Sequence, residues 1–196
     1  MSDVPKLTVR SAEIMAHLFE NPSVGVPRAV YWSCNVEFVP IVDASGQDEG
    51  ADAEWPCTLL CDWITWPIRD WRQIDGLTLA ESQGPVELEA SLYFFSMHQP
   101  LTSIELSFQR TVANCFRVRG RLVGDFENLE GSVLRGVSAE FEVDAEFVWL
   151  TVIPENLNPK TGTESEALKA LSAYADLQAY EQPEWDDRRW LFRPKR

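Results

Sequence analysis

The sequence lacks most features by which enzymes of known reaction classes are recognised. It has only two histidines, His17 and His98, so the imidazole base that a nucleophilic Ser or Cys usually needs is scarce, and no nucleophile-elbow sequence is present. The glycines at positions 124, 131 and 136 are too widely spaced for a phosphate-binding loop. The sequence therefore predicts no catalytic residues and no cofactor, and it favours a protein that is not an enzyme.

Cysteine is also sparse, with Cys34, Cys57, Cys61 and Cys115 spread along the chain. Only Cys57 and Cys61 are close together, and structural zinc would need two further ligands at a compatible spacing. A disulfide framework is not expected in a reducing cytosol. We therefore predict no metal site and interpret the four cysteines as small buried side chains.

Segments for export or membrane insertion are missing from the sequence as well. The first ten residues contain no apolar core of signal-peptide length. The longest uncharged stretch, residues 90–104, is interrupted by polar residues and a proline. We predict a soluble, cytoplasmic protein that does not bind membranes.

Positive charge is absent from a long part of the chain. The sequence has 31 Asp and Glu against 17 Lys and Arg, a net charge of −14, and no Lys or Arg lies between Arg28 and Arg69. A negative surface repels phosphate backbones and attracts basic surfaces over roughly 8 to 10 Å. Nucleic-acid binding is therefore disfavoured, and the charge distribution predicts a basic protein as partner.

What is present is the composition of an ordinary globular protein, with 45% hydrophobic and 24% charged residues in 196. This length and composition predict a single domain over residues 1–196. Within it, residues 43–54 are predicted to form a mobile acidic loop, and residues 184–196 a charged tail that carries aromatic residues. The fold class that we predict is α+β: a mostly antiparallel, twisted sheet with an N-terminal and a C-terminal helix packed on it.

Two segments carry the signals of longer helices, and residues 68–74 are predicted to form one or two helical turns. Residues 11–20 begin with Ser11 as a cap, and an apolar stripe follows at helical spacing; His17 lies off this stripe and is predicted to be a surface residue. The stripe consists of Ile14, Met15, Leu18 and Phe19. The second segment opens with Thr163 and Glu166, the spacing of a capping box, and is predicted to continue to Leu177.

Alternation of apolar and polar residues predicts the strands of the sheet. Residues 29–42 form one strand, with Trp32, Val36 and Phe38 on its buried face. Residues 86–94 and 103–108 are predicted to pair as a hairpin around the connection at residues 96–100. The longest alternation covers residues 137–149.

One predicted strand displays Arg117, Arg119 and Arg121, and the later one displays Glu140, Glu142, Asp144 and Glu146. If these strands pair antiparallel with Arg119 opposite Glu140 and Arg117 opposite Glu142, opposite charges face each other. Alternatively, the arginine row binds an anionic ligand.

The eight tryptophans supply candidate contact residues, and half of them lie in residues 55–72. Tryptophan is a favoured anchor residue in protein interfaces, and complementary charge speeds association. The predicted partner-binding surface combines these indoles with the nearby acidic residues: Asp48, Glu49, Asp52, Glu54, Trp55, Trp63, Trp66 and Trp71.

The leading functional hypothesis is a non-catalytic binding protein that masks or neutralises a basic protein partner. Its composition is similar to that of bacterial immunity proteins, which block the active surface of a toxin; the analogy is one of class, since no family motif is present. A second hypothesis is a binder of a sugar or ring-containing metabolite, or an enzyme, with a Trp-lined pocket and Asp62 or His98 as its polar group. A third is a structural subunit whose tail residues 190–192 insert into a neighbour.

Overall fold

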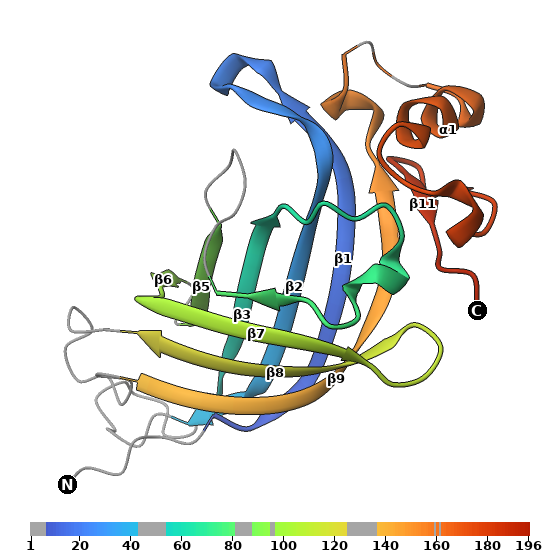
Figure 1. Cartoon of the computed structure of the whole chain (residues 1–196). Helices are drawn as coiled ribbons and strands as arrows, with labels where there is room; N and C mark the ends of the chain where they lie inside the picture. Colours follow the sequence, from blue (N-terminus) through green and yellow to red (C-terminus); the bar gives the residue numbers. More distant parts are fainter. Residues whose placement is uncertain are drawn as a thin grey trace, which may run out of the picture.

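The computed structural model describes residues 7–42, 54–80, 88–94, 97–124, 137–158, 160 and 162–196. Strands dominate these residues: eleven strands belong to one sheet, and a single α-helix accompanies them. The sheet is curled into a half-barrel (Figure 1). This architecture corrects the prediction of a twisted sheet covered by two helices.

Nine strands follow one another along the sheet in the order β4-β7-β8-β9-β1-β2-β3-β5-β6. All neighbours on this path pair antiparallel except β1 and β9, which are parallel. A short hairpin of β10 (Glu184–Trp185) and β11 (Trp190–Phe192) adds to β9. The nine strands are β1 (Val9–Asn21), β2 (Val26–Val42), β3 (Glu54–Ile64), β4 (Thr78–Leu79), β5 (Glu89–Phe94), β6 (Met97–Pro100), β7 (Ser103–Arg110), β8 (Cys115–Gly124) and β9 (Val137–Val152).

The predicted N-terminal helix is wrong, because residues 11–20 lie within strand β1. The side chains that enter the core alternate along the segment, as the period of two of a strand requires. These residues are Ala12, Ile14, Ala16 and Leu18. The apolar residues of the segment match both periods, and pairing with β2 on one side and β9 on the other decides in favour of the strand.

The C-terminal helix α1 (Glu164–Ser172) begins as predicted. The Thr163 hydroxyl accepts a hydrogen bond from the Glu166 backbone N–H, and the Glu166 carboxylate accepts one from the Thr163 backbone N–H at 3.0 Å. The helix is shorter than predicted, since it ends at Ser172 and a separate 3-10 turn covers Leu177–Ala179.

The predicted hairpin of residues 86–94 with 103–108 does not form. Strand β5 pairs with β6 in the arm of the half-barrel at the end of the strand order, which includes β3, β5 and β6. Strand β7 pairs with β8 in the opposite arm, at the start of the strand order, which includes β4, β7, β8 and β9. Leu101 and Thr102 connect β6 to β7. The Leu101 N–H donates to the Ala90 carbonyl of β5, and the Thr102 N–H donates to the Val123 carbonyl of β8. The two arms of the sheet therefore meet at this corner.

Strands β8 and β9 pair antiparallel as predicted, but the register differs by two residues from the prediction. Arg117 lies opposite Asp144, Arg119 opposite Glu142 and Arg121 opposite Glu140. The alternation of both strands is the same in either register, so the correct one could not be chosen from the sequence.

Large aromatic rings fill the concave side of the sheet. Trp32 and Trp71 both pack against Phe147, with ring centroids 5.6 and 6.0 Å apart. The Trp71 indole N–H donates to the Ala179 carbonyl at 2.9 Å, which ties the segment after β3 to the C-terminal part of the chain. Residues of α1 also enter this core, so the C-terminal segment closes one end of it.

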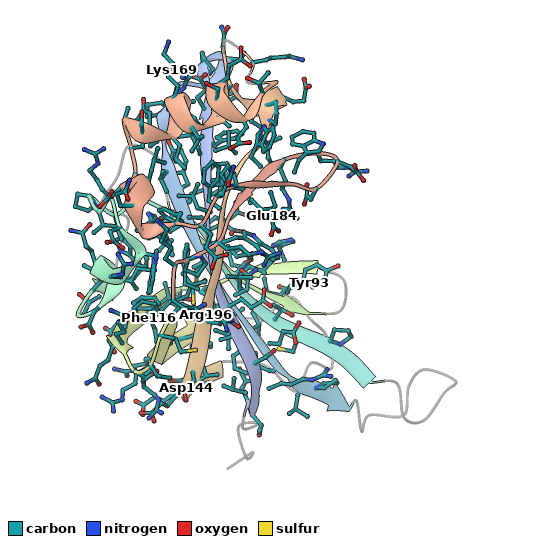
Figure 2. The ribbon with its side chains drawn as sticks, turned by 90° about the vertical axis from the view of Figure 1, so that its right-hand side faces the viewer. Tyr93, Phe116, Asp144, Lys169, Glu184 and Arg196 are labelled. Carbon is teal, nitrogen blue, oxygen red and sulfur yellow. The ribbon has the colours of Figure 1, made fainter. Side chains whose placement is uncertain are left out.

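The residues predicted as a tail form part of the sheet. Leu191 and Phe192 of β11 are buried, and they pair with Thr151 and Leu150 of β9. Figure 2 shows α1, marked by Lys169, at one end of the molecule and Asp144 toward the other. The predicted acidic loop lies outside the described residues, apart from Glu54 at the start of β3.

Candidate functional site

The structure separates the tryptophans that were predicted to form one contact surface. Trp71 has no exposed surface, and Trp66 packs on the core side against Trp32 and Phe108. Both rings are needed to fill the curled sheet, which a chain of this size could not leave empty. Trp71 is therefore a core residue, and Trp66 is a partly buried residue packed against the core. Among the indoles that the structure describes from this set, only Trp63 lies on the outer face, the face turned away from the core.

The remaining residues of the predicted surface cannot be placed in the same way. Asp48, Glu49 and Asp52 lie outside the described residues. Glu54 and Trp55 belong to β3, where they pair with β2, but their side chains are also outside what the structure describes.

A β-bulge brings Trp63 to the outer face. Cys57, Leu59 and Cys61 of β3 all point into the core, and continued alternation would place Trp63 there as well. Instead the register with β2 shifts, because Cys61 pairs with Cys34 and Ile64 pairs with Trp32. Strand β3 thus has one more residue than β2 between these two pairs, and Ile64 is again buried. Trp63 sits in the shift with a φ of 62°, a left-handed conformation that bulky residues seldom adopt.

Trp63 completes a cluster of four rings on the outer face. His17 of β1 lies opposite Tyr31 of β2, and Phe19 follows on the same side of β1. The Trp63 ring is 5.6 Å from His17, 5.2 Å from Phe19 and 5.4 Å from Tyr31, in edge-on arrangements. Tyr31 is completely buried although it is not part of the hydrophobic core, and the other three rings of the cluster pack against it.

His17 differs from the surface histidine that was predicted. It is largely buried within the ring cluster, and this burial lowers the pKa of its imidazole to about 4. The neutral ring is therefore the dominant form at pH 7, and it packs as an aromatic residue. The signal in the sequence for a buried His17 was that both faces of β1 are rich in apolar residues. Met15, His17 and Phe19 lie on one face and alternate with the core residues on the other.

Asp62 and His98, predicted as alternative polar groups of a ligand site, are brought to the same region of the outer face. Asp62 lies opposite Glu89 of β5, and His98 of β6 lies opposite Tyr93. Burial raises the pKa of Asp62, the negative charge of Glu89 raises it further, and His98 acts in the opposite direction. Ser91 lies between them, with its hydroxyl 2.9 Å from the Nδ1 of His98.

The Ser91 and His98 pair does not form a nucleophilic site. Ser91 is only 3% exposed, so its hydroxyl is not accessible to a substrate carbonyl. Neither residue lines the open depression over β7, β8 and β9. The arrangement satisfies a buried hydroxyl and does not require a catalytic role.

The strands that carry the ring cluster, together with β5, also carry the carboxylates of Glu13, Glu37, Asp62 and Glu89, which have no Lys or Arg partner among the described residues. Strands β3, β5 and β6, and β2 beyond Arg28, contain no Lys or Arg. None of the ion pairs in the described residues involves an acidic residue of this region. We call this region the aromatic-acidic face and define it by His17, Phe19, Tyr31 and Trp63 together with Glu13, Glu37, Asp62 and Glu89.

The outer face of β8 and β9 carries the charged rows that the sequence indicated, here called the Arg-acid ladder: Arg117, Arg119 and Arg121 with Glu140, Glu142, Asp144 and Glu146. Arg117 donates to Asp144 at 2.6 Å and to Glu142 at 3.1 Å, and Arg119 donates to Glu142 at 2.6 Å. Two of the three arginines are therefore neutralised within the fold.

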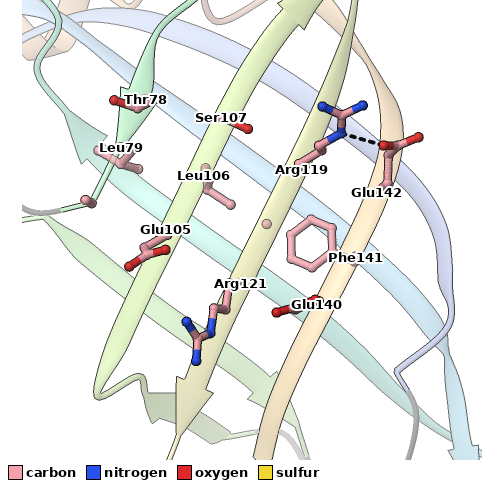
Figure 3. A pocket seen from close by; sticks show the side chains of 12 residues that line it. Thr78, Leu79, Glu105, Leu106, Ser107, Arg119, Arg121, Glu140, Phe141 and Glu142 are labelled. Carbon is pink, nitrogen blue, oxygen red and sulfur yellow. Dashed lines mark hydrogen bonds and ion pairs between the residues drawn. The ribbon is translucent and has the colours of Figure 1, made fainter.

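An open depression of about 730 Å³ lies over this ladder and the adjacent β7. Figure 3 shows Arg121 between Glu105 and Glu140, and the ion pair of Arg119 with Glu142. None of the residues that line the depression is a tryptophan. It is therefore not the Trp-lined pocket that was predicted for a metabolite.

No family model, curated protein or solved structure matches the chain. Within the described ranges, no helix is both long enough and apolar enough to cross a membrane. In the same ranges, His, Cys, Asp and Glu side chains do not gather in groups of three that could hold a metal ion.

Proposed function

We propose that the chain is a non-catalytic protein-binding module that uses its aromatic-acidic face to cover a basic surface of another protein. This places it, by analogy of class, beside proteins that mask a toxin or another basic partner. The observation that carries the proposal is a cluster of rings, three of them partly exposed, beside Asp62, a carboxylate that has no ion-pair partner among the described residues.

Each part of this face has a physical task in binding. Uncompensated carboxylates attract a basic surface and accelerate its association within about a Debye length. The rings supply rigid apolar area, and tryptophan and tyrosine are the residue types that most often dominate interface energetics. Because the rings are already packed against one another, little side-chain entropy would be lost on binding.

The two other hypotheses gain less support. A metabolite pocket inside the sheet would need space beside the indoles, but Trp32, Trp66 and Trp71 are packed against other rings. A tail that inserts into a neighbour would need free apolar side chains at residues 190–192, but Leu191 and Phe192 are already buried within the chain. A cytoplasmic location stays a prediction.

Cross-linking capture from a native-host extract at low salt, read by mass spectrometry, tests the proposal. The wild type is compared with the double variants Asp62→Asn/Glu89→Gln, on the aromatic-acidic face, and Glu105→Gln/Glu140→Gln, on the β7 to β9 arm. Both remove two negative charges. We expect captured proteins to be basic, and we expect the first variant and raised salt to weaken capture while the second variant does not. Capture of acidic proteins, or equal loss with both variants, would contradict the proposal.

A further inference from the structure

We infer that Asp62 and Trp63 together bind an arginine side chain of the partner protein. The inference rests on the proposed function and specifies what the aromatic-acidic face recognises. It starts from the bulge in β3, which interrupts the alternation and so places two consecutive side chains, a carboxylate and an indole, on the same outer face.

The backbone at this position is unfavourable for tryptophan. A φ of 62° is the conformation that glycine adopts without steric cost, and it is strained for a bulky side chain. A bulge needed only for the curvature of the sheet would be served better by glycine or asparagine. The strained tryptophan therefore indicates that the indole itself has a use at this position.

The Trp63 ring has a fixed orientation and a partly exposed surface. Edge-on contacts to His17, Phe19 and Tyr31 fix the orientation of the indole, and Trp63 remains partly exposed. Tryptophan is the strongest of the three aromatic side chains in attracting a cation to its face. A planar guanidinium can stack on such a ring and donate to a carboxylate at the same time, whereas the ammonium of lysine is compact and strongly hydrated.

Asp62 has no Lys or Arg partner among the described residues. It is half-buried, it lies opposite Glu89, and it takes part in none of the ion pairs of the described residues. Burial and the charge of Glu89 raise the pKa of its carboxyl, whereas His98 lowers this pKa, and the net shift is upward. An incoming guanidinium would relieve both effects, since it supplies an opposite charge and hydrogen-bond donors in a forked geometry.

The chain itself contains the combination that we infer. The Arg189 guanidinium lies over the Trp149 ring at 5.5 Å from its centroid, and its Nε donates to Asp186 at 2.8 Å. This internal arrangement joins one arginine to an indole and a carboxylate. Asp62 and Trp63 present the same two acceptors without an arginine from the described part of the chain.

Two tryptophan-free peptides of equal length, one with four arginines and one with four lysines, test the inference by titration calorimetry against the full chain. We expect the arginine peptide to bind the wild type about two- to five-fold more tightly, because only the planar guanidinium can stack on the indole and donate to the carboxylate at the same time. Asp62→Asn and Trp63→Phe should both reduce this preference. The matched controls Glu140→Gln, on the ladder, and Trp185→Phe, at the 46%-exposed indole of β10, should preserve it.

The outcomes separate this inference from the proposed function. Equal affinity for both peptides, or an equal effect of Asp62→Asn and Glu140→Gln, overturns the arginine site; the proposed function stands if capture of a basic partner still depends on the aromatic-acidic face. Failure of both peptides to bind also overturns the arginine site. Since Asp62→Asn keeps the size of the side chain, a circular dichroism melt of this variant shows that lost preference does not result from unfolding.

Discussion

The two arms of the curled sheet both display acidic residues on their outer faces but differ in what those residues contact. In the Arg-acid ladder, Glu142 and Asp144 accept hydrogen bonds from arginines of the neighbouring strand. On the aromatic-acidic face, Asp62 lies opposite another carboxylate and beside a cluster of rings. Asp144 and Tyr93, which mark the two arms, are well apart in Figure 2. In one arm carboxylates pair with arginines within the fold, and in the other Asp62 and Glu89 take part in no ion pair of the described residues.

The pKa shifts of the two arms have opposite directions, which makes the contrast measurable. The hydrogen bond from Arg117 lowers the pKa of Asp144, and that from Arg119 lowers the pKa of Glu142. The pKa of Asp62 is instead raised, chiefly by burial. Carboxylates with lowered pKa values stabilise the fold when ionised, whereas a carboxylate with a raised pKa destabilises it when ionised.

The largest expected effect is the acid sensitivity of the ring cluster. Because burial lowers the pKa of His17 to about 4, the native state favours the neutral ring. The stability that the neutral His17 ring contributes to the native state is complete above about pH 6.5 and is lost as the pH falls toward 4. The loss approaches about 3 kcal/mol of unfolding free energy, at roughly 1.4 kcal/mol per pKa unit.

Urea unfolding at pH 7 and pH 4 measures this loss for the wild type, for His17→Phe and for His98→Gln. His17→Phe should lose less stability on acidification, because its ring does not titrate. His98→Gln keeps the ring cluster intact, so it should retain the acid sensitivity that comes from His17. Identical pH profiles for the wild type and His17→Phe would contradict the assignment of acid sensitivity to the cluster.

A smaller effect is expected on the inner side of the ladder arm. Gly120 of β8 lies opposite Phe141 of β9, and a Cβ at Gly120 would be 2.2 Å from the Phe141 Cζ. We expect Gly120→Ala to lower the unfolding free energy by about 1 to 3 kcal/mol, the usual cost of overpacking. Thermal unfolding in a cycle with Phe141→Leu checks the cause, since the smaller side chain should reduce the cost of Gly120→Ala. An unchanged cost beside Phe141→Leu would exclude the ring as its source.

The smallest effect compares one carboxylate from each arm. Asp62→Asn should raise the unfolding free energy at pH 7 by up to about 1 kcal/mol, because it removes a partly buried charge and a like-charge pair with Glu89 across the strands. Asp144→Asn should lower it, because Arg117 loses its partner. Chemical unfolding of both variants gives the signs.

The pH dependence of these two variants gives a second check. The gain from Asp62→Asn should shrink as the pH falls through the raised pKa of Asp62, since the wild-type carboxyl is then protonated. The loss from Asp144→Asn should shrink when the wild-type carboxyl is protonated at still lower pH, and it should also shrink in high salt. Equal signs for the two variants at pH 7 would remove the contrast between the arms.

Features with local signals could be predicted from the sequence. The alternation of β8 and β9 identified both strands and the faces that carry their charges, and the capping box located the start of α1. The buried face of β2, with Trp32, Val36 and Phe38, is also confirmed. In each case the residues that decide the structure lie within a few positions of one another.

Features decided by distant partners could not be predicted. Segment 11–20 satisfies the helix and strand periods equally, and only the flanking strands select the strand. The bulge at Trp63 depends on a slip of the β2 register, with no glycine to mark it. The sequence therefore identified Asp62 and Trp63 as candidates but missed His17, Phe19 and Tyr31, whose importance follows from the pairing of β1 with β2.

The parallel pairing of β1 with β9 has a consequence for how the protein is made. Glu13 lies opposite Glu146, so one side of β1 acquires its partner only after most of the chain has left the ribosome. Until then β1 offers unpaired backbone groups to other nascent chains. Pairings so remote in sequence fold slowly, and during this interval we expect the protein to depend on chaperones to prevent aggregation.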